Sequence, residues 1–194
     1  TAKCRYNASI RLKRIGRYTF MTTIVLSLGL ILAPVLMVAN LTLAYPTQVV
    51  NCIQIFLAVA VLVLSVVNAT AGYDTRAHLL NECGDRIKDL SRELRTELQG
   101  GAPDLKAFNS RYAEITTDSE MHSRSDYALA RLQASDVYNI TGLGRAWTRA
   151  SVFVAETIPY LVPTAMLASE AIFILDMLGV TGVLTPYMRR LAGA

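Results

Sequence analysis

The chain has 194 residues, of which 53% are hydrophobic and 18% are charged, and its formal net charge is +4. This composition is typical of a membrane protein with a water-soluble part and argues against a purely soluble domain. The cysteines Cys4, Cys52 and Cys83 are scattered and form no CxxC pair. The sequence therefore predicts neither a disulfide framework nor a zinc site.

All the charge of the first 73 residues lies before the long apolar stretch. Residues 1–73 contain six basic residues and no acidic one: Lys3, Arg5, Arg11, Lys13, Arg14 and Arg17. By the positive-inside rule, this segment should stay in the cytoplasm. Membrane topology thus explains the charges without nucleic-acid binding. Residues 1–18 form either a short amphipathic helix on the inner leaflet or a basic anchor without fixed structure.

Residues 18–73 are 56 residues without a single Asp, Glu, Lys, Arg or His. One membrane span needs roughly 20 apolar residues, so this stretch is long enough for two. A break at Tyr45-Pro46-Thr47-Gln48 separates them. We expect helices at 19–44 and 49–71, paired as an antiparallel hairpin over 19–72. The apolar run is too long for a cleavable signal peptide.

The first predicted span has one face of small and polar residues. Its members are Thr22, Leu26, Gly29, Ala33, Leu36 and Asn40. Small residues at such spacing let membrane helices approach closely, so this face predicts a packing seam. Pro34 follows the seam and should kink the helix.

The second predicted span has a polar stripe at spacings of three and four residues. Its members are Asn51, Gln54, Ala58, Val61, Ser65 and Asn68. Amides in hydrocarbon are expensive without partners, so the stripe should face a bundle interior or a pore. As a pore lining, it would be closed by an apolar constriction near Ala58 and Val61. The alternative is that its amides only hold helices together.

The pattern changes after residue 73 to a charged helix with a narrow apolar seam. The seam consists of Leu80, Cys83, Ile87, Leu90 and Leu94. It is typical of a coiled-coil-like contact and serves either oligomerisation or an internal core. The helix should end at residues 100–103, and a second helix after Pro103 should pack against it in antiparallel fashion.

Two successive capping boxes precede a further helix. Thr117 with Glu120, and Ser123 with Asp126, both have the required spacing, so the helix start stays open. His122 and Asp126 stand at i,i+4 and are placed to form a hydrogen bond. No nucleophile elbow or oxyanion element accompanies them, so we expect a structural link and no catalytic residue.

The last part of the chain is again apolar but carries acids. We expect a loop at 142–145, followed by apolar helices over 150–194. Glu156, Glu170 and Asp176 interrupt that region, and its longest uncharged piece, 157–169, has 13 residues. Because this is short of a span, helices packed on neighbours are favoured. A third, acid-bearing membrane or interfacial helix is the alternative.

Two groups of residues resemble a known family. After the two spans come Tyr73, Ala77, Leu80, Cys83, Ile87 and Leu90, and later Tyr112-Ala113-Glu114-Ile115, Glu120-Met121-His122 and Asp126-Tyr127. This resembles the SLATT domains over roughly residues 15–150, with Met121 in place of the family's usual Asn. The resemblance implies a structural motif of Tyr112, Glu120, His122, Asp126 and Tyr127. It also implies a pore-forming effector of bacterial conflict systems, triggered by a nucleotide second messenger.

These observations predict an all-α protein with a membrane hairpin (19–72) after a basic segment (1–18). A cytosolic helical bundle (73–149) and apolar C-terminal helices (150–194) would follow. The first hypothesis is a homo-oligomeric pore in the bacterial inner membrane, acting in anti-phage defence, with its N-terminus and C-terminal region cytoplasmic. Its candidate partners are the bilayer and a cyclic nucleotide or regulatory protein, and it needs no cofactor or metal. The second hypothesis is a membrane-anchored scaffold without a pore.

Overall fold

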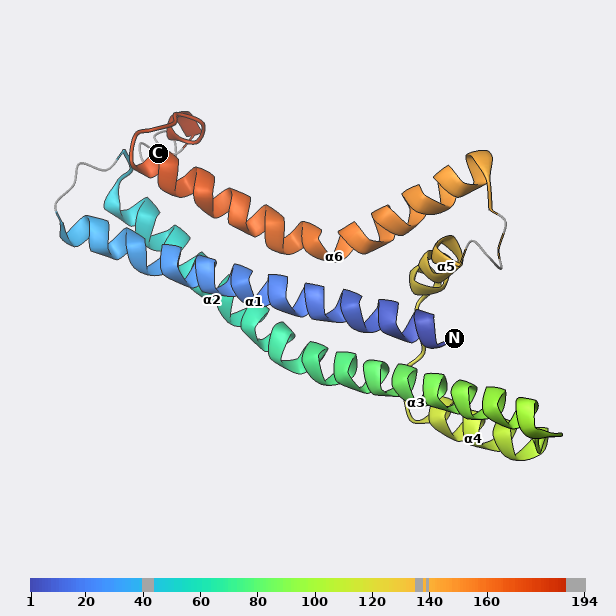
Figure 1. The fold of residues 1–194 in the computed structure, drawn as a ribbon. Helices are drawn as coiled ribbons and strands as arrows, with labels where there is room; N and C mark the ends of the chain where they lie inside the picture. Colours follow the sequence, from blue (N-terminus) through green and yellow to red (C-terminus); the bar gives the residue numbers. More distant parts are fainter. Residues whose placement is uncertain (40–43, 135–137, 139, 188–194) are drawn as a thin grey trace. The chain divides into compact units, whose positions relative to one another are not determined.

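The computed structural model describes residues 1–39, 44–134, 138 and 140–187. Every regular element in these residues is a helix, which confirms the all-α prediction (Figure 1). The helices are α1 (Ala2–Val38), α2 (Thr47–Ala71), α3 (Tyr73–Gly100), α4 (Leu105–Thr117), α5 (Arg124–Gln133) and α6 (Gly142–Met177).

The chain divides into two compact units, each built from separate parts of the sequence. The polar unit contains Thr1–Gly16 and Gly72–Ile158, and the apolar unit contains Arg17–Ala71 and Pro159–Ala194. Helices α1 and α6 each contribute to both units, because each begins in the polar unit and ends in the apolar one.

The basic N-terminal segment is a central helix of the polar unit. Residues 2–16 are the first part of α1, and Ala8 and Leu12 pack with Ala77 and Leu80 of α3. Ser9 adds a hydrogen bond from its hydroxyl to the Ala77 carbonyl oxygen, at 2.7 Å. The helix expected in one interpretation of residues 1–18 is confirmed, and a segment without fixed structure is wrong. Ala8 and Leu12 of this helix are covered by α3.

The predicted hairpin segments correspond to the later part of α1 and to α2. The first predicted span extends to residue 44, but residues 40–43, including Asn40, lie outside the described residues. Helix α2 starts two residues earlier than predicted, at Thr47. It is separated from α3 by Gly72, whose φ of 56° is the left-handed conformation that glycine adopts at low cost.

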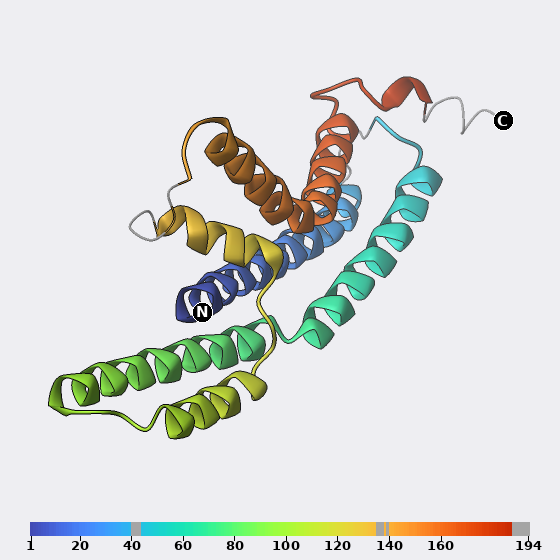
Figure 2. The same ribbon diagram turned by 90° about the vertical axis from the view of Figure 1, so that its right-hand side faces the viewer.

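Helices α3 and α4 form the predicted antiparallel pair (Figure 2). Asp104 caps α4 by accepting hydrogen bonds from the Lys106 and Ala107 amides, at 3.0 and 3.3 Å. Three of the seam residues, Cys83, Ile87 and Leu90, are buried with residues of α4 in one core cluster; its α4 members are Phe108 and Ile115, and Leu94 packs at its edge. The seam is thus a core within one chain, and its role in oligomerisation stays a prediction.

Helix α5 begins at the second of the two predicted capping boxes. The Ser123 hydroxyl accepts from the Asp126 amide at 3.3 Å, and an Asp126 carboxylate oxygen accepts from the Ser123 amide at 2.9 Å. The first box is not used, because α4 continues to Thr117.

Helix α6 is one helix of 36 residues, which corrects one prediction. The expected loop at 142–145 is wrong, since Gly142, with φ 64°, already starts the helix. The apolar helices expected over 150–194 are, up to Met177, part of this one helix, and Pro159 and Pro163 lie within it. By length and composition, α6 joins α1 and the α2–α3 segment as a third helix able to cross a membrane.

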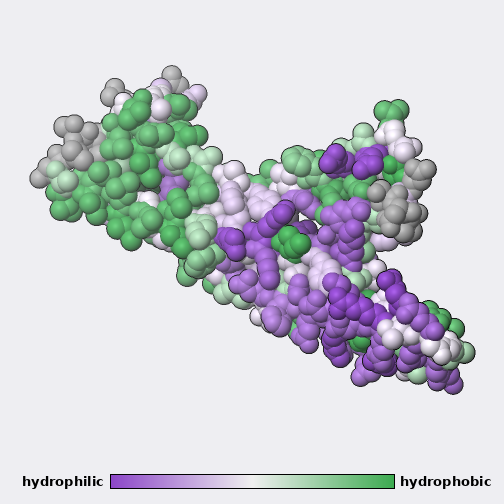
Figure 3. Space-filling view, viewed as in Figure 1, coloured by the Kyte–Doolittle hydropathy of each residue, from purple (hydrophilic) through white to green (hydrophobic). Residues whose placement is uncertain are grey.

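The apolar unit shows hydrophobic residues over most of the face seen in Figure 3. Many of its large side chains, such as Leu28, Ile31, Phe56 and Leu62, are exposed. A hydrophobic surface of this kind suits lipid rather than water.

Candidate membrane site

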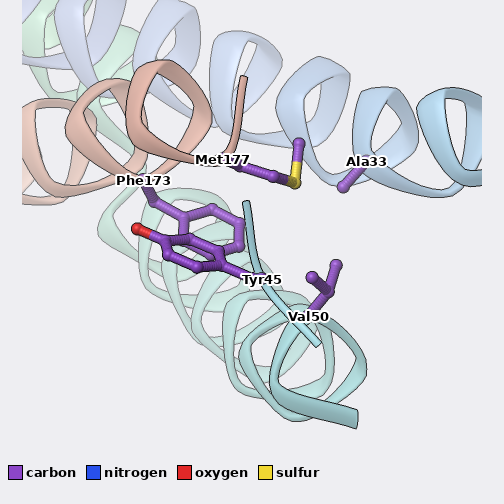
Figure 4. Close-up of a cluster of buried hydrophobic side chains, with 5 residues drawn as sticks. All are labelled: Ala33, Tyr45, Val50, Phe173 and Met177. Carbon is purple, nitrogen blue, oxygen red and sulfur yellow. The ribbon is translucent and has the colours of Figure 1, made fainter. Parts of the chain in front are cut away.

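One end of the apolar unit is closed by an aromatic and aliphatic cluster. Tyr45, from the segment between α1 and α2, stacks on Phe173 of α6 with ring centroids 5.6 Å apart. Ala33 of α1, Val50 of α2 and Met177 of α6 complete the cluster (Figure 4). All three helices therefore meet at this level.

The predicted packing seam of the first span is confirmed. Thr22, Leu26 and Ala33 are buried, and the seam glycine Gly29 lies against Glu170 of α6. A Cβ atom at position 29 would overlap the Glu170 carboxylate, so the missing side chain leaves the space that this carboxylate occupies. The seam is the surface on which α6 packs.

Gly29, Gln54 and Glu170 share one level, about one helical turn away from the cluster. Gly29 precedes Ala33 by four residues, Gln54 follows Val50 by four, and Glu170 precedes Phe173 by three. Helix α2 runs opposite to α1, as the Thr19–Asn68 hydrogen bond at its far end requires. Helix α6 runs with α1, because Tyr18 meets Thr164 and Gly29 meets Glu170. One turn from the cluster, toward the N-termini of α1 and α6 and toward the C-terminus of α2, therefore leads to the same level in all three helices.

Polar atoms without hydrogen-bond partners lie inside this apolar unit. They are Thr22 Oγ1, Gln54 Nε2 and Glu170 Oε1, one from each helix. Glu170 as a whole is only 6% exposed. A buried polar atom without a partner costs free energy, and the cost is greater for a carboxylate. The interior thus carries polar groups that its own chain leaves unsatisfied.

Asp176, six residues after Glu170 on α6, is a buried acid whose hydrogen bonds are satisfied. It is fully buried, yet its carboxylate accepts hydrogen bonds from side chains and backbone amides around it. The donors are the Tyr45 hydroxyl, the Thr181 hydroxyl (3.1 Å), the Leu184 amide (2.9 Å), and the Thr185 amide (2.8 Å) and hydroxyl (3.0 Å). Asp176 therefore holds the end of α6 to the segments beside it.

The predicted pore-lining stripe is divided between two surfaces of α2. Gln54, Val61 and Asn68 are half-buried on the packed side, and Asn68 accepts a hydrogen bond from the Thr19 hydroxyl at 2.9 Å. Asn51, Ala58 and Ser65 are exposed, seven residues apart, and Ser65 lines a groove between α1 and α2 together with Asn68. The Ser65 hydroxyl donates to the Val61 carbonyl of its own helix at 2.8 Å. The lining role of the stripe stays a prediction.

In the polar unit, the motif residues make structural contacts. Asp126 is 1% exposed, and Arg11 donates to both of its carboxylate oxygens at 3.0 Å. Burial opposes ionisation of Asp126, but the hydrogen bonds from Arg11 and Ser123 outweigh burial, and the pKa of Asp126 is lowered. Sequence reasoning assigned Arg11 to topology alone, and no local pattern pointed to a partner 115 residues away.

The expected His122–Asp126 hydrogen bond is wrong, because Asp126 bonds Arg11 and Ser123 instead. The His122 ring lies near Tyr127, with centroids 6.4 Å apart, and its Nδ1 is buried without a partner. Burial, and next the charge of Arg5, lower the pKa of His122.

The two remaining motif residues also form links within the polar unit. Glu120 pairs with Arg76 of α3 at 2.6 and 2.7 Å. The Tyr112 hydroxyl donates to Thr1 Oγ1 at 3.1 Å. Within the described residues, no group of three or more His, Cys, Asp or Glu side chains is placed to hold a metal ion.

The family comparison matches most of the chain. Residues 1–174 match SLATT_5, the SMODS and SLOG-associating 2TM effector domain family 5. The chain belongs to this family. The resemblance seen in the sequence is confirmed, and the match extends beyond residues 15–150 at both ends. No curated protein and no solved structure matches the chain.

The extent of the SLATT_5 match bears on the membrane site. It includes the basic start of α1 and most of α6, so Arg11 and Glu170 both lie inside the SLATT_5 region. The family description names two transmembrane helices, whereas the described residues of this SLATT_5 chain form three helices long and apolar enough to cross a membrane. The third of them, α6, carries Glu170.

Proposed function

We propose that this SLATT_5 chain is a membrane effector whose copies assemble around a water-filled path across the bacterial inner membrane. It would act in a conflict system such as anti-phage defence, and a nucleotide second messenger or a partner protein would control opening. The observation that carries the proposal is the set of unsatisfied polar atoms on Thr22, Gln54 and Glu170. Such atoms in an apolar unit require water, an ion or a second protein surface.

The outer surface of α2 supports assembly from several copies. Asn51, Ala58 and Ser65 are exposed in one chain and would face lipid if the chain stayed alone. Polar and small residues on membrane helices favour helix–helix contacts or a water-filled interior over hydrocarbon. Contact with other copies over this surface would remove it from lipid.

The stripe provides a test of the pore. Val61 is half-buried and Val63 is 55% exposed, on different sides of α2. If residues 58–61 form a dewetted constriction, Val61→Asn should wet it, and vesicles containing the full chain should leak dye without a trigger. Val63→Asn is the matched control and should not leak. Equal leakage from both variants, at equal membrane content, would contradict the pore.

Topology is a second part of the proposal. The Ala44 amide donates to the Met177 carbonyl oxygen at 3.0 Å, so the end of α6 lies beside the segment joining α1 and α2. With a cytoplasmic N-terminus, residues after Met177 would then face the outside. This differs from the cytoplasmic C-terminal region expected from sequence, because that expectation gave α6 no crossing.

Cysteine labelling tests this topology. Single cysteines at Thr47, Ser110 and Val180 would be introduced into the full chain after Cys4, Cys52 and Cys83 are replaced. An impermeant maleimide added to intact cells should label positions 47 and 180 but not 110. Labelling of 47 without 180 would restore the cytoplasmic C-terminal region, and labelling of 110 would reverse the whole assignment.

A scaffold without a pore is the second candidate. The Thr19–Asn68 hydrogen bond favours it, since here a stripe amide serves to hold α1 and α2 together. A scaffold predicts no dye leakage from any stripe variant, including Val61→Asn. The vesicle experiment therefore separates the two candidates.

A further inference from the structure

Beyond Arg17, the charges in the described part of the apolar unit have one sign. In its described part, Arg17 stands at the boundary with the polar unit, and the charged residues beyond it are Glu170 and Asp176. A charged solute that entered the described part of this unit beyond Arg17 would therefore meet carboxylates and no ammonium or guanidinium group.

Of these two acids, Glu170 is the one with a carboxylate oxygen free to bind a ligand. Asp176 already accepts hydrogen bonds from Tyr45, Leu184 and Thr185, so its lone pairs are in use. Glu170 Oε1 has no partner, and the carboxylate is positioned against Gly29. A groove of about 520 Å³ along α1 and α6 has Glu170 among otherwise apolar lining residues, including Val25, Leu32 and Ile174.

A second unsatisfied polar group lies at the level of Glu170. Gln54 of α2 reaches this level from the opposite direction, and its Nε2 is also buried without a partner. The unsatisfied Gln54 atom is a donor and the unsatisfied Glu170 atom is an acceptor, so water at this level would be able to accept from one and donate to the other.

An apolar residue of the same size would avoid the cost of burying Glu170. A lone carboxylate among apolar side chains is destabilising, whereas a well-packed apolar replacement is often neutral or stabilising. A carboxylate in this position is explained when it binds a positively charged partner during function.

We infer that Glu170 is the cation-binding residue of the membrane path and makes that path selective for cations. The inference rests on the proposed function, because it assigns the class of permeant solute to the same path. Copies assembled with the groove along α1 and α6 toward the path would each contribute one Glu170, and rings of acidic side chains attract cations and repel anions.

The test is the reversal potential of the full chain in planar bilayers under a KCl gradient. Recordings use the wild-type sequence and, as an untriggered open form, Val61→Asn. The K⁺/Cl⁻ permeability ratio should exceed one and should fall about tenfold in Glu170→Gln, the factor equivalent to about 1.4 kcal/mol of ion attraction. Glu170→Asp should keep most of the selectivity, because it keeps the charge.

Glu156→Gln on the same helix is the matched control and should leave the ratio unchanged, because Glu156 lies in the polar unit. A current that is anion-selective, or unaltered by Glu170→Gln at equal protein content, would overturn the cation assignment and leave the pore intact. No current from either the wild type or Val61→Asn would overturn the pore and the cation assignment together.

Discussion

The two units of this protein treat a buried acid in opposite ways. In the polar unit, Asp126 is held by two hydrogen bonds from Arg11 and caps α5 together with Ser123. In the apolar unit, Glu170 is nearly as buried, but its Oε1 has no partner. The carboxylate lies against Gly29, where a side chain is missing. The first arrangement fixes a structure, and the second leaves a group available for binding.

The difference follows from what each acid meets on neighbouring helices. The basic start of α1 passes through the polar unit and brings a guanidinium to Asp126. Beyond Arg17, the same helix contains no charged residue, so α1 has no cation to offer Glu170. Helix α1 thus provides a basic partner for Asp126 in the polar unit and none for Glu170 in the apolar unit.

Breaking the Asp126 arrangement should have the largest effect. Asp126→Ala leaves Arg11 without its partner and removes the α5 cap, so the free energy of unfolding should fall by about 3–5 kcal/mol. Thermal and chemical unfolding in detergent, followed by circular dichroism, would measure it. A loss below about 1 kcal/mol would mean that Arg11 and Asp126 contribute no more than a surface pair.

Removing the other acid should change stability in the opposite direction. Glu170→Met keeps the side-chain volume and removes the unpaired carboxylate, so stability should rise by about 1–3 kcal/mol. Asp126→Asn, measured in the same detergent, is the comparison and should lower stability. If Glu170→Met also destabilised the protein, Glu170 would have a structural partner and the contrast between the units would disappear.

A pH effect of moderate size should come from His122 in the polar unit. Its pKa in the folded state lies below the ordinary value of 6.5, because burial disfavours the charged ring. The unfolded chain therefore binds a proton more readily, and stability should fall as pH drops through about 6.5 and level off below the folded pKa. Unfolding temperatures between pH 7.5 and 5.5 would show it.

His122→Gln should flatten that pH dependence. His78→Gln, at an exposed position on α3, should leave it as it is in the wild type. An unaltered slope in the His122 variant would assign the dependence to other groups of the polar unit.

The smallest effect should come from a pair exposed to water. Arg76 and Glu120 are 41% and 47% exposed, although their hydrogen bonds are short. Glu120→Gln should lower the free energy of unfolding by at most about 1 kcal/mol, and by less in high salt. A loss as large as that of Asp126→Ala would show that Glu120, a SLATT motif residue, does more than join α3 to the segment before α5.

Much of the local structure was predictable from the sequence. The uncharged run of residues 18–73, the apolar spacing of residues 80–94, and the capping residues Asp104 and Ser123 determine helices, their ends and their buried faces. The packing seam of α1 was also predictable, since small residues at three- and four-residue spacing mark a close contact. These features depend on hydropathy and on residues within a few helical turns.

The pairings within each unit were decided only by the tertiary structure. Sequence alone placed Arg11 at a membrane surface and left open whether residues 150–177 enter the membrane. In the structure, Arg11 pairs with Asp126 and α6 is one helix. Glu170 contacts Gly29, and the α2 stripe is packed along only one edge. Both features likewise depend on helices far apart in sequence. The physical reason is that periodicity shows which face of a helix is buried, but only the packed neighbour determines whether a buried charge finds a partner.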